Sequence, residues 1–351
     1  MNRENDQKNM DLCTERGLEN YPSYIKNYFY YLRDMVGKIA NKSTAQSRYN
    51  NLQGVKKFYD YIINKYNKEL NEINEEEFRD YWENVCLFNQ KELLKGNKVE
   101  NGASRINGNL SMLVAFYSYV VRYENFPVDY SKSIDKKVVP KVKVKDELIF
   151  LNKEEIDLLN KNIENGVGSS RQRKLNERVK NRDKLIVALD ISTGIRARAL
   201  RNVDLGDLIL DKEKSEITVW DKGNKIYSKN VPDQFFDLIN QWLEDREKIL
   251  QNCKNIKEED KNALFISIRG TRLTVKALDN MLEKYTYNIK KKITMHKLRA
   301  TGAMFTYFLT KDPYQIKEFL EHENINTSKY YVQAGEEMLK NNAHVFGQLF
   351  A

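Results

Sequence analysis

Apolar residues recur at helical spacing from residue 21 to residue 124, and this periodicity constrains the fold more than any other feature. An apolar side chain every three or four residues gives a helix one apolar stripe, which must pack against another element. Further segments of this kind begin near Ser43, Glu75 and Ala103, and the one from Glu75 is expected to run unbroken to Leu94. Four amphipathic helices with short connections predict a compact helical domain with most of its aromatic side chains in the core.

Residues 127–147 interrupt this pattern. Pro127 and Pro140 break helices, and the residues around them are rich in lysine. We interpret the segment as a basic linker between two domains, although its alternating valines and lysines also fit an exposed edge strand. A linker that follows a phosphate backbone would contact it through lysines. The candidates are Lys141, Lys143 and Lys145.

Residues 148–331 mix helices with short strands. One helix is expected after Asn152 and another over about Asn181 to Ile191. Strand-like runs on either side of Gly223-Asn224 predict a β-hairpin over about residues 217–228. The fold class is therefore predicted to be mainly α-helical, with a small antiparallel β-sheet in the second domain. Helices resume near Asp233, Val275, His296 and Pro313.

Charge and cysteine content narrow the class of protein. Lys and Arg outnumber Asp and Glu by 59 to 50, and a basic surface attracts polyanions such as nucleic acid. Three cysteines far apart in the chain suggest neither a disulfide framework nor a cysteine-based metal site. No signal peptide is evident, and the longest apolar run, near residues 185–191, is too short to cross a bilayer. A cytoplasmic protein is predicted.

Two helix-associated segments of the second half could hold an anion. Gly194 allows a tight turn that places Arg196 at a helix start, where backbone donors and a guanidinium can converge. His296 and Arg299 share one helix face, a pairing that suits a phosphate better than a metal cation. Taken singly, each segment also fits an ordinary solvated surface.

Three further segments add a lysine, a histidine and a tyrosine. Lys222 lies at the expected hairpin tip, where a lysine can swing toward a ligand. His322 ends a helix that begins at Pro313, and the pair Tyr330-Tyr331 follows. These segments too are weak signals when taken one at a time.

Together and in this order, the segments resemble the phage-integrase family of tyrosine recombinases, the relatives of Cre, Xer and lambda integrase. That family carries a Thr-Gly-x-Arg box, a Gly-Lys-Gly-like hairpin and a His-x-x-Arg box. It ends with a Leu-Gly-His box nine residues before a nucleophilic tyrosine. The matching positions here are Thr193 to Arg196, Lys222 to Lys225, His296 to Arg299, Leu320 to His322, and Tyr331. This spacing selects Tyr331 over Tyr330.

The resemblance implies a two-domain DNA clamp. Residues 19–126 would be the helical core-binding domain and residues 148–331 the catalytic domain, with a loose tail over residues 1–18. Residues 332–351 would form a terminal helix, and whether it docks on a neighbouring subunit or on its own domain stays open. The implied catalytic residues are Arg196, Lys222, His296, Arg299, His322 and Tyr331.

The chain departs from the family pattern at three positions. Ala199 replaces the acidic residue that usually follows the first arginine by three positions, so either another group holds Arg196 or Arg198 reshapes the site. Glu321 replaces the glycine of the Leu-Gly-His box, and Ala300 stands where many relatives have a second histidine. None of these changes removes a catalytic residue.

The implied activity is site-specific recombination through a 3′-phosphotyrosyl intermediate, in the service of a mobile element. The partners would be double-stranded DNA with inverted-repeat core sites, a homotetramer on that DNA, and accessory DNA-bending proteins in the nucleoid. No metal, cofactor or membrane is expected. The alternatives are a type IB topoisomerase-like relaxer and a catalytically impaired DNA-binding relative, while a metal-dependent nuclease lacks ligands. Besides the linker lysines, phosphate contacts are expected from Arg48, Lys56, Lys57 and Arg105.

Overall fold

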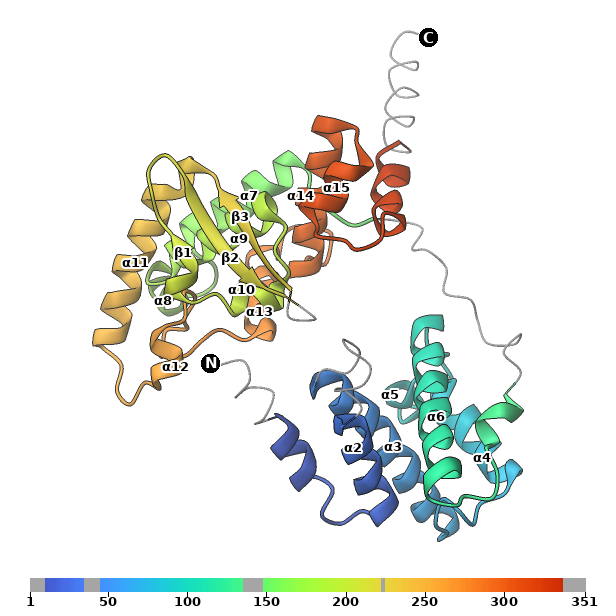
Figure 1. Ribbon diagram of the computed structural model, residues 1–351. Helices are drawn as coiled ribbons and strands as arrows, with labels where there is room; N and C mark the ends of the chain where they lie inside the picture. The colour runs from blue at the N-terminus through green and yellow to red at the C-terminus, as the bar shows by residue number, and fades with distance from the viewer. Residues whose placement is uncertain (1–9, 35–44, 135–147, 222–224, 337–351) are drawn as a thin grey trace, which may run out of the picture. The chain divides into compact units, whose positions relative to one another are not determined.

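The computed structural model describes residues 10–34, 45–134, 148–221 and 225–336, and these fall into two compact units (Figure 1). The first unit ends at Val144 and the second begins at Lys145. Several predictions concern residues outside the described ranges, namely those on Lys141, Lys143, Lys145 and Lys222 and on most of the C-terminal tail.

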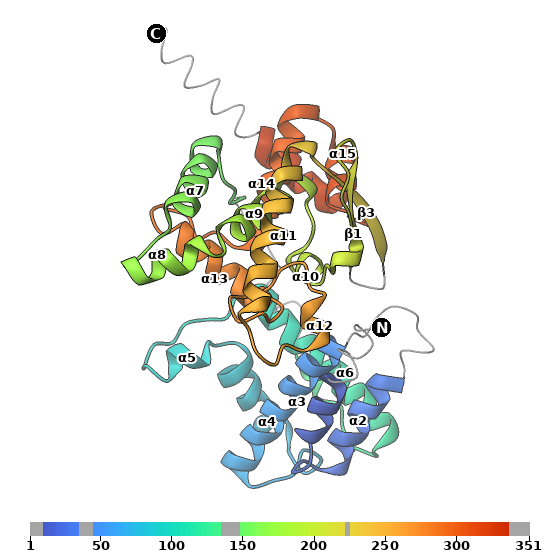
Figure 2. The same ribbon diagram turned by 90° about the vertical axis from the view of Figure 1, so that its left-hand side faces the viewer.

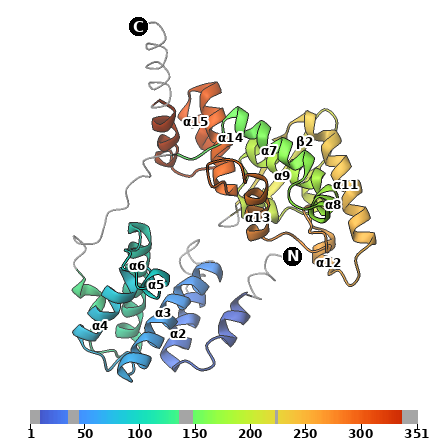
Figure 3. The same ribbon diagram turned by 180° about the vertical axis from the view of Figure 1, so that it is seen from behind.

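The first unit is helical throughout, as predicted. Helices α2, α3 and α6 contact one another and lie side by side when the unit is seen from behind (Figure 3). Gly54 allows α3 and α6 to approach closely, because a Cβ there would lie 2.9 Å from the Met112 side chain. The elements are α2 (Ser23–Asp34), α3 (Ala45–Tyr66), α4 (Glu75–Tyr81), a π-turn (Trp82–Cys86), α5 (Gln90–Leu93), α6 (Ala103–Tyr123) and a 3₁₀ turn (Tyr130–Ser133).

The prediction of a single helix from Glu75 to Leu94 was wrong, because the structure has α4, a π-turn and α5 in this segment. The helical ladder widens after Tyr81, and Leu87 N–H donates to the Trp82 carbonyl five residues back, at 3.1 Å. The Asn101 side chain then donates to the carbonyls of Cys86 and Phe88 at 2.9 and 2.8 Å. A residue from outside the helix therefore satisfies the carbonyls at its end and stops it.

Residues 10–18, which were expected to belong to a loose tail, are instead ordered. Residues 10–16 are helical, and Leu18 is 2% exposed in the core of the first unit. The Arg48 guanidinium of α3 donates to the Asp11 carboxylate at 3.0 Å, which holds this first helical turn in place.

The second unit surrounds one central helix. Helix α9 contacts α7, α11 and α14 (Figure 2) and carries buried residues on more than one side, including Leu185, Ile186 and Leu189. A helix that is apolar around most of its surface is a buried one. The helices of this unit are α7 (Lys153–Asn165), α8 (Ser170–Glu177), α9 (Lys180–Thr193), α10 (Ala197–Arg201), α11 (Phe236–Gln251), α12 (Glu258–Lys261), α13 (Val275–Tyr285), α14 (Met295–Thr310) and α15 (Pro313–Phe319).

A three-stranded antiparallel sheet lies in this second unit, in the order β1-β2-β3. Strands β2 (Ser215–Trp220) and β3 (Ile226–Val231) form the predicted hairpin, with Trp220 opposite Ile226. Strand β1 (Leu208–Ile209) was not predicted, because two residues are too few to show an alternating pattern. The prediction of a mainly α-helical fold with a small antiparallel sheet is confirmed.

A smaller apolar cluster packs α14 and α15 against a helical segment over residues 326–336. It includes Ala303, Met304, Ile316, Leu320 and Tyr331. Within the described parts of the chain, no helix is both long enough and apolar enough to span a membrane.

Candidate active site

The turn between α9 and α10 places Arg196. Gly194 ends α9 with a φ of 61°, a left-handed conformation that favours glycine. A Cβ there would also lie 2.6 Å from the ring of Phe319 in α15, so the glycine allows the end of α15 to approach this turn. Arg196 follows at the N-cap of the short helix α10, and its side chain is 40% exposed.

Arg299 ties this turn to the end of α15. It lies in α14, is 4% exposed, and donates through one terminal nitrogen to the Gly194 carbonyl and through the other to the Leu320 carbonyl. A buried guanidinium needs such partners, because an unpaired buried charge costs several kcal/mol. His296 lies one helical turn earlier in α14, on the same face.

The end of α15 places His322. Glu321 has a φ of 50°, and the amide of His322 donates to the Lys317 carbonyl at 2.9 Å. The amide of Glu321 donates to the Glu318 carbonyl at 3.1 Å, which completes a Schellman motif with Glu321 at its left-handed position. The family glycine therefore corresponds to a position where positive φ is required, and Glu321 adopts that conformation here.

Tyr331 lies in the helical segment 326–336, within the apolar cluster formed with α14 and α15, and is 6% exposed. Three residues earlier on the same helical face, the fully buried Ser328 lies 3.4 Å from Nδ1 of His322. The helix that carries the tyrosine therefore also contacts the histidine ring.

Electrostatic coupling shows that these side chains gather in one place. Burial, together with the charges of Arg299, Arg196 and His296, lowers the pKa of His322 to about 4. Burial raises the pKa of Tyr331, whereas the positive charge of Arg299 opposes that rise. Five of the six expected catalytic residues thus lie together, and the sixth, Lys222, is outside the described residues.

Ion pairs of Glu321, which follows α15, connect the β2–β3 hairpin to this site. Glu321 forms ion pairs with Lys225 and Lys229 of the hairpin, both at 2.9 Å. Lys229 also donates to the carbonyls of Glu318 and Phe319 at 3.0 and 3.1 Å. These contacts bring the strand that follows Lys222 against the Schellman turn that carries His322.

Three polar side chains at the site were missed from the sequence. Asp221 pairs with Arg196, and the Tyr227 hydroxyl donates to the same carboxylate at 3.3 Å. Asp190 of α9 is fully buried, which raises its pKa well above the ordinary value, while the charge of Arg299 opposes the rise. No periodicity or motif marks these residues, because Asp190 and Tyr227 lie within an ordinary helix and strand and Asp221 lies where a hairpin turn begins.

Two of the residues of the first unit that were expected to contact DNA, Arg48 and Lys56, are already engaged by other groups of the protein. Arg48 is 6% exposed and paired with Asp11, a placement that does not suit a phosphate contact. Lys56 donates to the Gly17 carbonyl at 2.7 Å, and its ammonium lies 4.6 Å from the centre of the Tyr21 ring.

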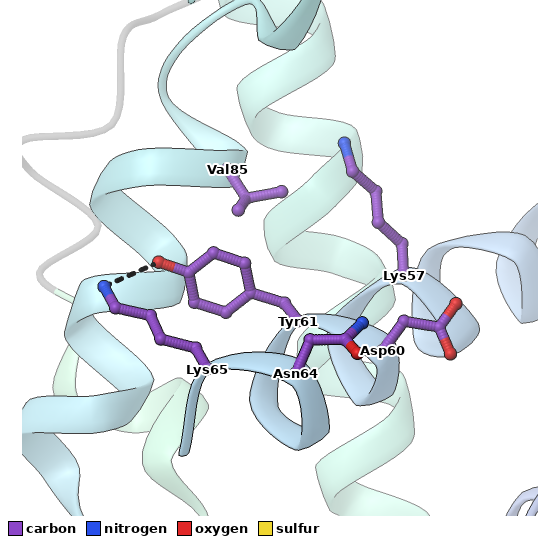
Figure 4. A pocket seen from close by; sticks show the side chains of 6 residues that line it. All are labelled: Lys57, Asp60, Tyr61, Asn64, Lys65 and Val85. Atoms are coloured by element: carbon purple, nitrogen blue, oxygen red, sulfur yellow. Dashed lines mark hydrogen bonds between the residues drawn. The ribbon is translucent and has the colours of Figure 1, made fainter. Parts of the chain in front are cut away.

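Lys57 and Arg105 form a more suitable pair. Lys57 lines an open pocket of about 500 Å³, where Figure 4 shows its ammonium reaching away from that of Lys65. Its pKa is lowered by burial and by the charge of Arg105, so cations from α3 and α6 lie near each other. The other residues that line the pocket are Asp60, Tyr61, Asn64 and Val85.

Within the described ranges, no group of three or more His, Cys, Asp or Glu side chains is arranged to hold a metal ion. The cysteines in those ranges are free thiols.

Comparison with known proteins identifies the family. Residues 149–338 match the model of the phage integrase family. A tyrosine recombinase XerS from Streptococcus gordonii is 28% identical over 73% of this chain and 76% of its own. A tyrosine recombinase XerS from Streptococcus agalactiae is 26% identical over 91% of this chain and 94% of its own.

Solved structures share the fold. XerH site-specific recombinase bound to a palindromic difH substrate superposes with a TM-score of 0.60 at 18% identity, covering 92% of this chain and 95% of that one. A lambda integrase dimer bound to a COC′ core site gives a TM-score of 0.58 at 12% identity, with coverages of 89% and 95%. Because the family match spans more than half of its length, this chain belongs to the phage integrase family and is a tyrosine recombinase, an enzyme of site-specific DNA recombination.

Proposed function

We propose that this enzyme cuts and rejoins DNA through a covalent bond between Tyr331 and a 3′ phosphate. The observation that supports the proposal is a cluster in which Arg196, Arg299 and His296 lie near His322, while Arg299 also lies near the buried phenol of Tyr331. Such a cationic pocket suits a phosphodiester, whose charge builds up on the non-bridging oxygens during attack.

Each group has a chemical role in the proposed reaction. The Tyr331 oxygen forms a bond to phosphorus while the bond from phosphorus to the 5′ oxygen breaks. Arg196 and Arg299 would neutralise the non-bridging oxygens, and His296 and His322 would donate hydrogen bonds or accept the phenol proton. The phosphate charge raises the pKa of a nearby histidine, so His322 becomes a better proton acceptor once DNA is bound.

The leaving 5′ oxygen needs a proton, and Lys222 at the hairpin tip would supply it. The products are a 3′-phosphotyrosine and a free 5′-hydroxyl. The covalent link retains the energy of the phosphodiester, so the 5′-hydroxyl of a second strand can attack it and reverse the step without ATP.

The test is covalent capture on a DNA duplex that carries a nick near the cleavage site, in the presence of EDTA. The wild-type protein should form an adduct, and Tyr331→Phe should bind the DNA but form none. Tyr330→Phe is the matched control and should retain adduct formation. An adduct with Tyr331→Phe, or its loss only with Tyr330→Phe, would contradict the assignment.

We further propose that the enzyme acts as a homotetramer on inverted-repeat core sites and serves a mobile element. Strand exchange needs two duplexes and four active sites, which supports a tetramer. Exchange between two sites would exclude a simple relaxing enzyme, which would only nick and reseal. Inverted repeats in the DNA flanking the gene would support the mobile-element role, and their absence would favour chromosome resolution.

A further inference from the structure

The inference concerns the ion pair between Arg196 and Asp221. Asp221 directly follows strand β2, its side chain is 6% exposed, and its amide closes the hairpin by donating to the Lys225 carbonyl at 2.8 Å. The pair joins residues 25 positions apart in the chain, so it holds the α9–α10 turn and the hairpin together.

The Asp221 carboxylate is itself held from a second strand. The Tyr227 hydroxyl of β3 donates to the same oxygen, at 3.3 Å, that accepts from Arg196. A nearly buried carboxylate with two donors has a defined position, and an arginine paired with it has a defined orientation.

No acidic residue of α10 could hold Arg196 instead. The position one helical turn after Arg196 is Ala199, which is 2% exposed and has no polar atoms in its side chain. The remaining residues of α10 are Ala197, Arg198, Leu200 and Arg201. The carboxylate therefore has to come from elsewhere in the fold, and Asp221 supplies it.

The pair leaves most of the guanidinium available. The ion pair uses one terminal nitrogen of Arg196, whereas a guanidinium has five N–H donors in a fixed fork. The Arg196 side chain is 40% exposed, so its other edge can face solvent or a bound phosphate.

We propose that Asp221 is a positioning residue that orients Arg196 toward the scissile phosphate. This inference rests on the proposed function, because it assigns the phosphate to Arg196. A misplacement of about 1 Å in a catalytic group can cost on the order of 100-fold in rate. Removal of the carboxylate should therefore slow cleavage without abolishing DNA binding.

The experiment measures single-turnover adduct formation at saturating nicked DNA, with DNA affinity and thermal stability measured in parallel. Asp221→Ala and Asp221→Asn should cleave roughly 10- to 100-fold more slowly than wild type. Glu216→Ala is the control and should cleave normally, because it removes a carboxylate of β2 that pairs with Lys214 and not with Arg196. Tyr227→Phe removes one donor to Asp221 and should show a smaller loss.

A double-mutant cycle distinguishes positioning from a general structural role. In an Arg196→Ala background, Asp221→Ala should cause no further loss of cleavage. In an Asp221→Ala background, Ala199→Asp should restore part of the rate, because it returns a carboxylate one helical turn from Arg196. If the Ala199→Asp variant does not fold, the double-mutant cycle and the Tyr227→Phe variant still test whether Asp221 acts by positioning Arg196.

Three outcomes would overturn the inference. Faster cleavage by Asp221→Ala would mean that the carboxylate occludes Arg196, and unchanged cleavage would mean that it has no role. An equal loss with and without Arg196 would mean that Asp221 acts through another group. If wild-type protein forms no adduct through Tyr331, the proposed function fails instead, so the two failures are distinguishable.

Discussion

The neutral imidazole of His322 illustrates how strongly one residue of the site depends on its surroundings. Its pKa of about 4 lies below the ordinary histidine value near 6.5, since burial and the neighbouring charges of Arg299 and Arg196 disfavour a further positive charge. In the DNA-free protein the ring is therefore uncharged at pH 7. At this pH the imidazole of His322 can accept a proton without first losing one to solvent.

This pKa predicts a pH dependence of stability. Between pH 6.5 and about 4 the unfolded chain holds a proton on His322 that the folded protein does not, so stability falls as the pH falls. Partial exposure reduces the effect to on the order of 2 kcal/mol. Urea unfolding of wild type and His322→Asn at pH 7, 6 and 4.5 measures this dependence. The free energy of unfolding should fall more between pH 7 and pH 4.5 for wild type than for His322→Asn. A difference between the two proteins that stays constant with pH would refute the shifted pKa.

At the scale of elements, the hairpin and the end of α15 are joined at Glu321. The left-handed conformation costs a non-glycine residue about 1 kcal/mol, yet its carboxylate pairs with Lys225 and Lys229. Lys229 is 15% exposed and Lys225 is 42% exposed, so the inner pair is the better shielded from solvent. The ion pairs of Glu321 therefore connect the hairpin to the turn that carries His322, and they offset the cost of the left-handed backbone.

Two substitutions at this position should separate strain from tethering. Glu321→Ala loses both ion pairs and keeps the strain, whereas Glu321→Gly loses the pairs and relieves the strain. The glycine variant should be the more stable of the two by about 1 kcal/mol, as measured by chemical denaturation. Cleavage should fall to the same extent in both, because both lose the two ion pairs between Glu321 and the hairpin. Equal stability of the two variants would show that the backbone at residue 321 is unstrained.

At the scale of the whole molecule, each unit has its own apolar core and its own set of basic residues. The first unit brings Lys57 and Arg105 together from α3 and α6, and no ion pair is found for either within the described ranges. Lys68, by contrast, is engaged with Glu77 at 2.6 Å. The first two are therefore the better candidates for phosphate contacts.

The salt dependence of DNA affinity tests this assignment. Each phosphate contact contributes about 0.9 to the slope of log affinity against log salt concentration. Lys57→Ala and Arg105→Ala should each weaken binding and lower that slope by about 0.9, whereas Lys68→Ala should leave it unchanged. Titrations between 50 and 200 mM salt measure the slope. An unchanged slope for both test variants would remove this part of α3 and α6 from the DNA contact.

Most of the helices and the family could be predicted from the order of residues alone. Apolar periodicity reflects which side of a helix is buried, a local property that is visible in the order of residues. Capping signals such as Asn152 with Glu155 and the proline at the start of α15 are local too, and the structure has both. The boxes that carry Arg196, Arg299 and His322 were recognisable because their residues are close together in sequence.

The contacts that join distant segments could not be predicted in this way, because they form only when whole elements pack together. The end of the helix at the π-turn depends on Asn101, which is 15 residues from the Cys86 carbonyl that it caps. The pairing of Asp221 with Arg196 depends on how the hairpin packs against the α9–α10 turn. Such contacts follow from the packing of whole elements, and that packing leaves no periodic trace in the residues that make them.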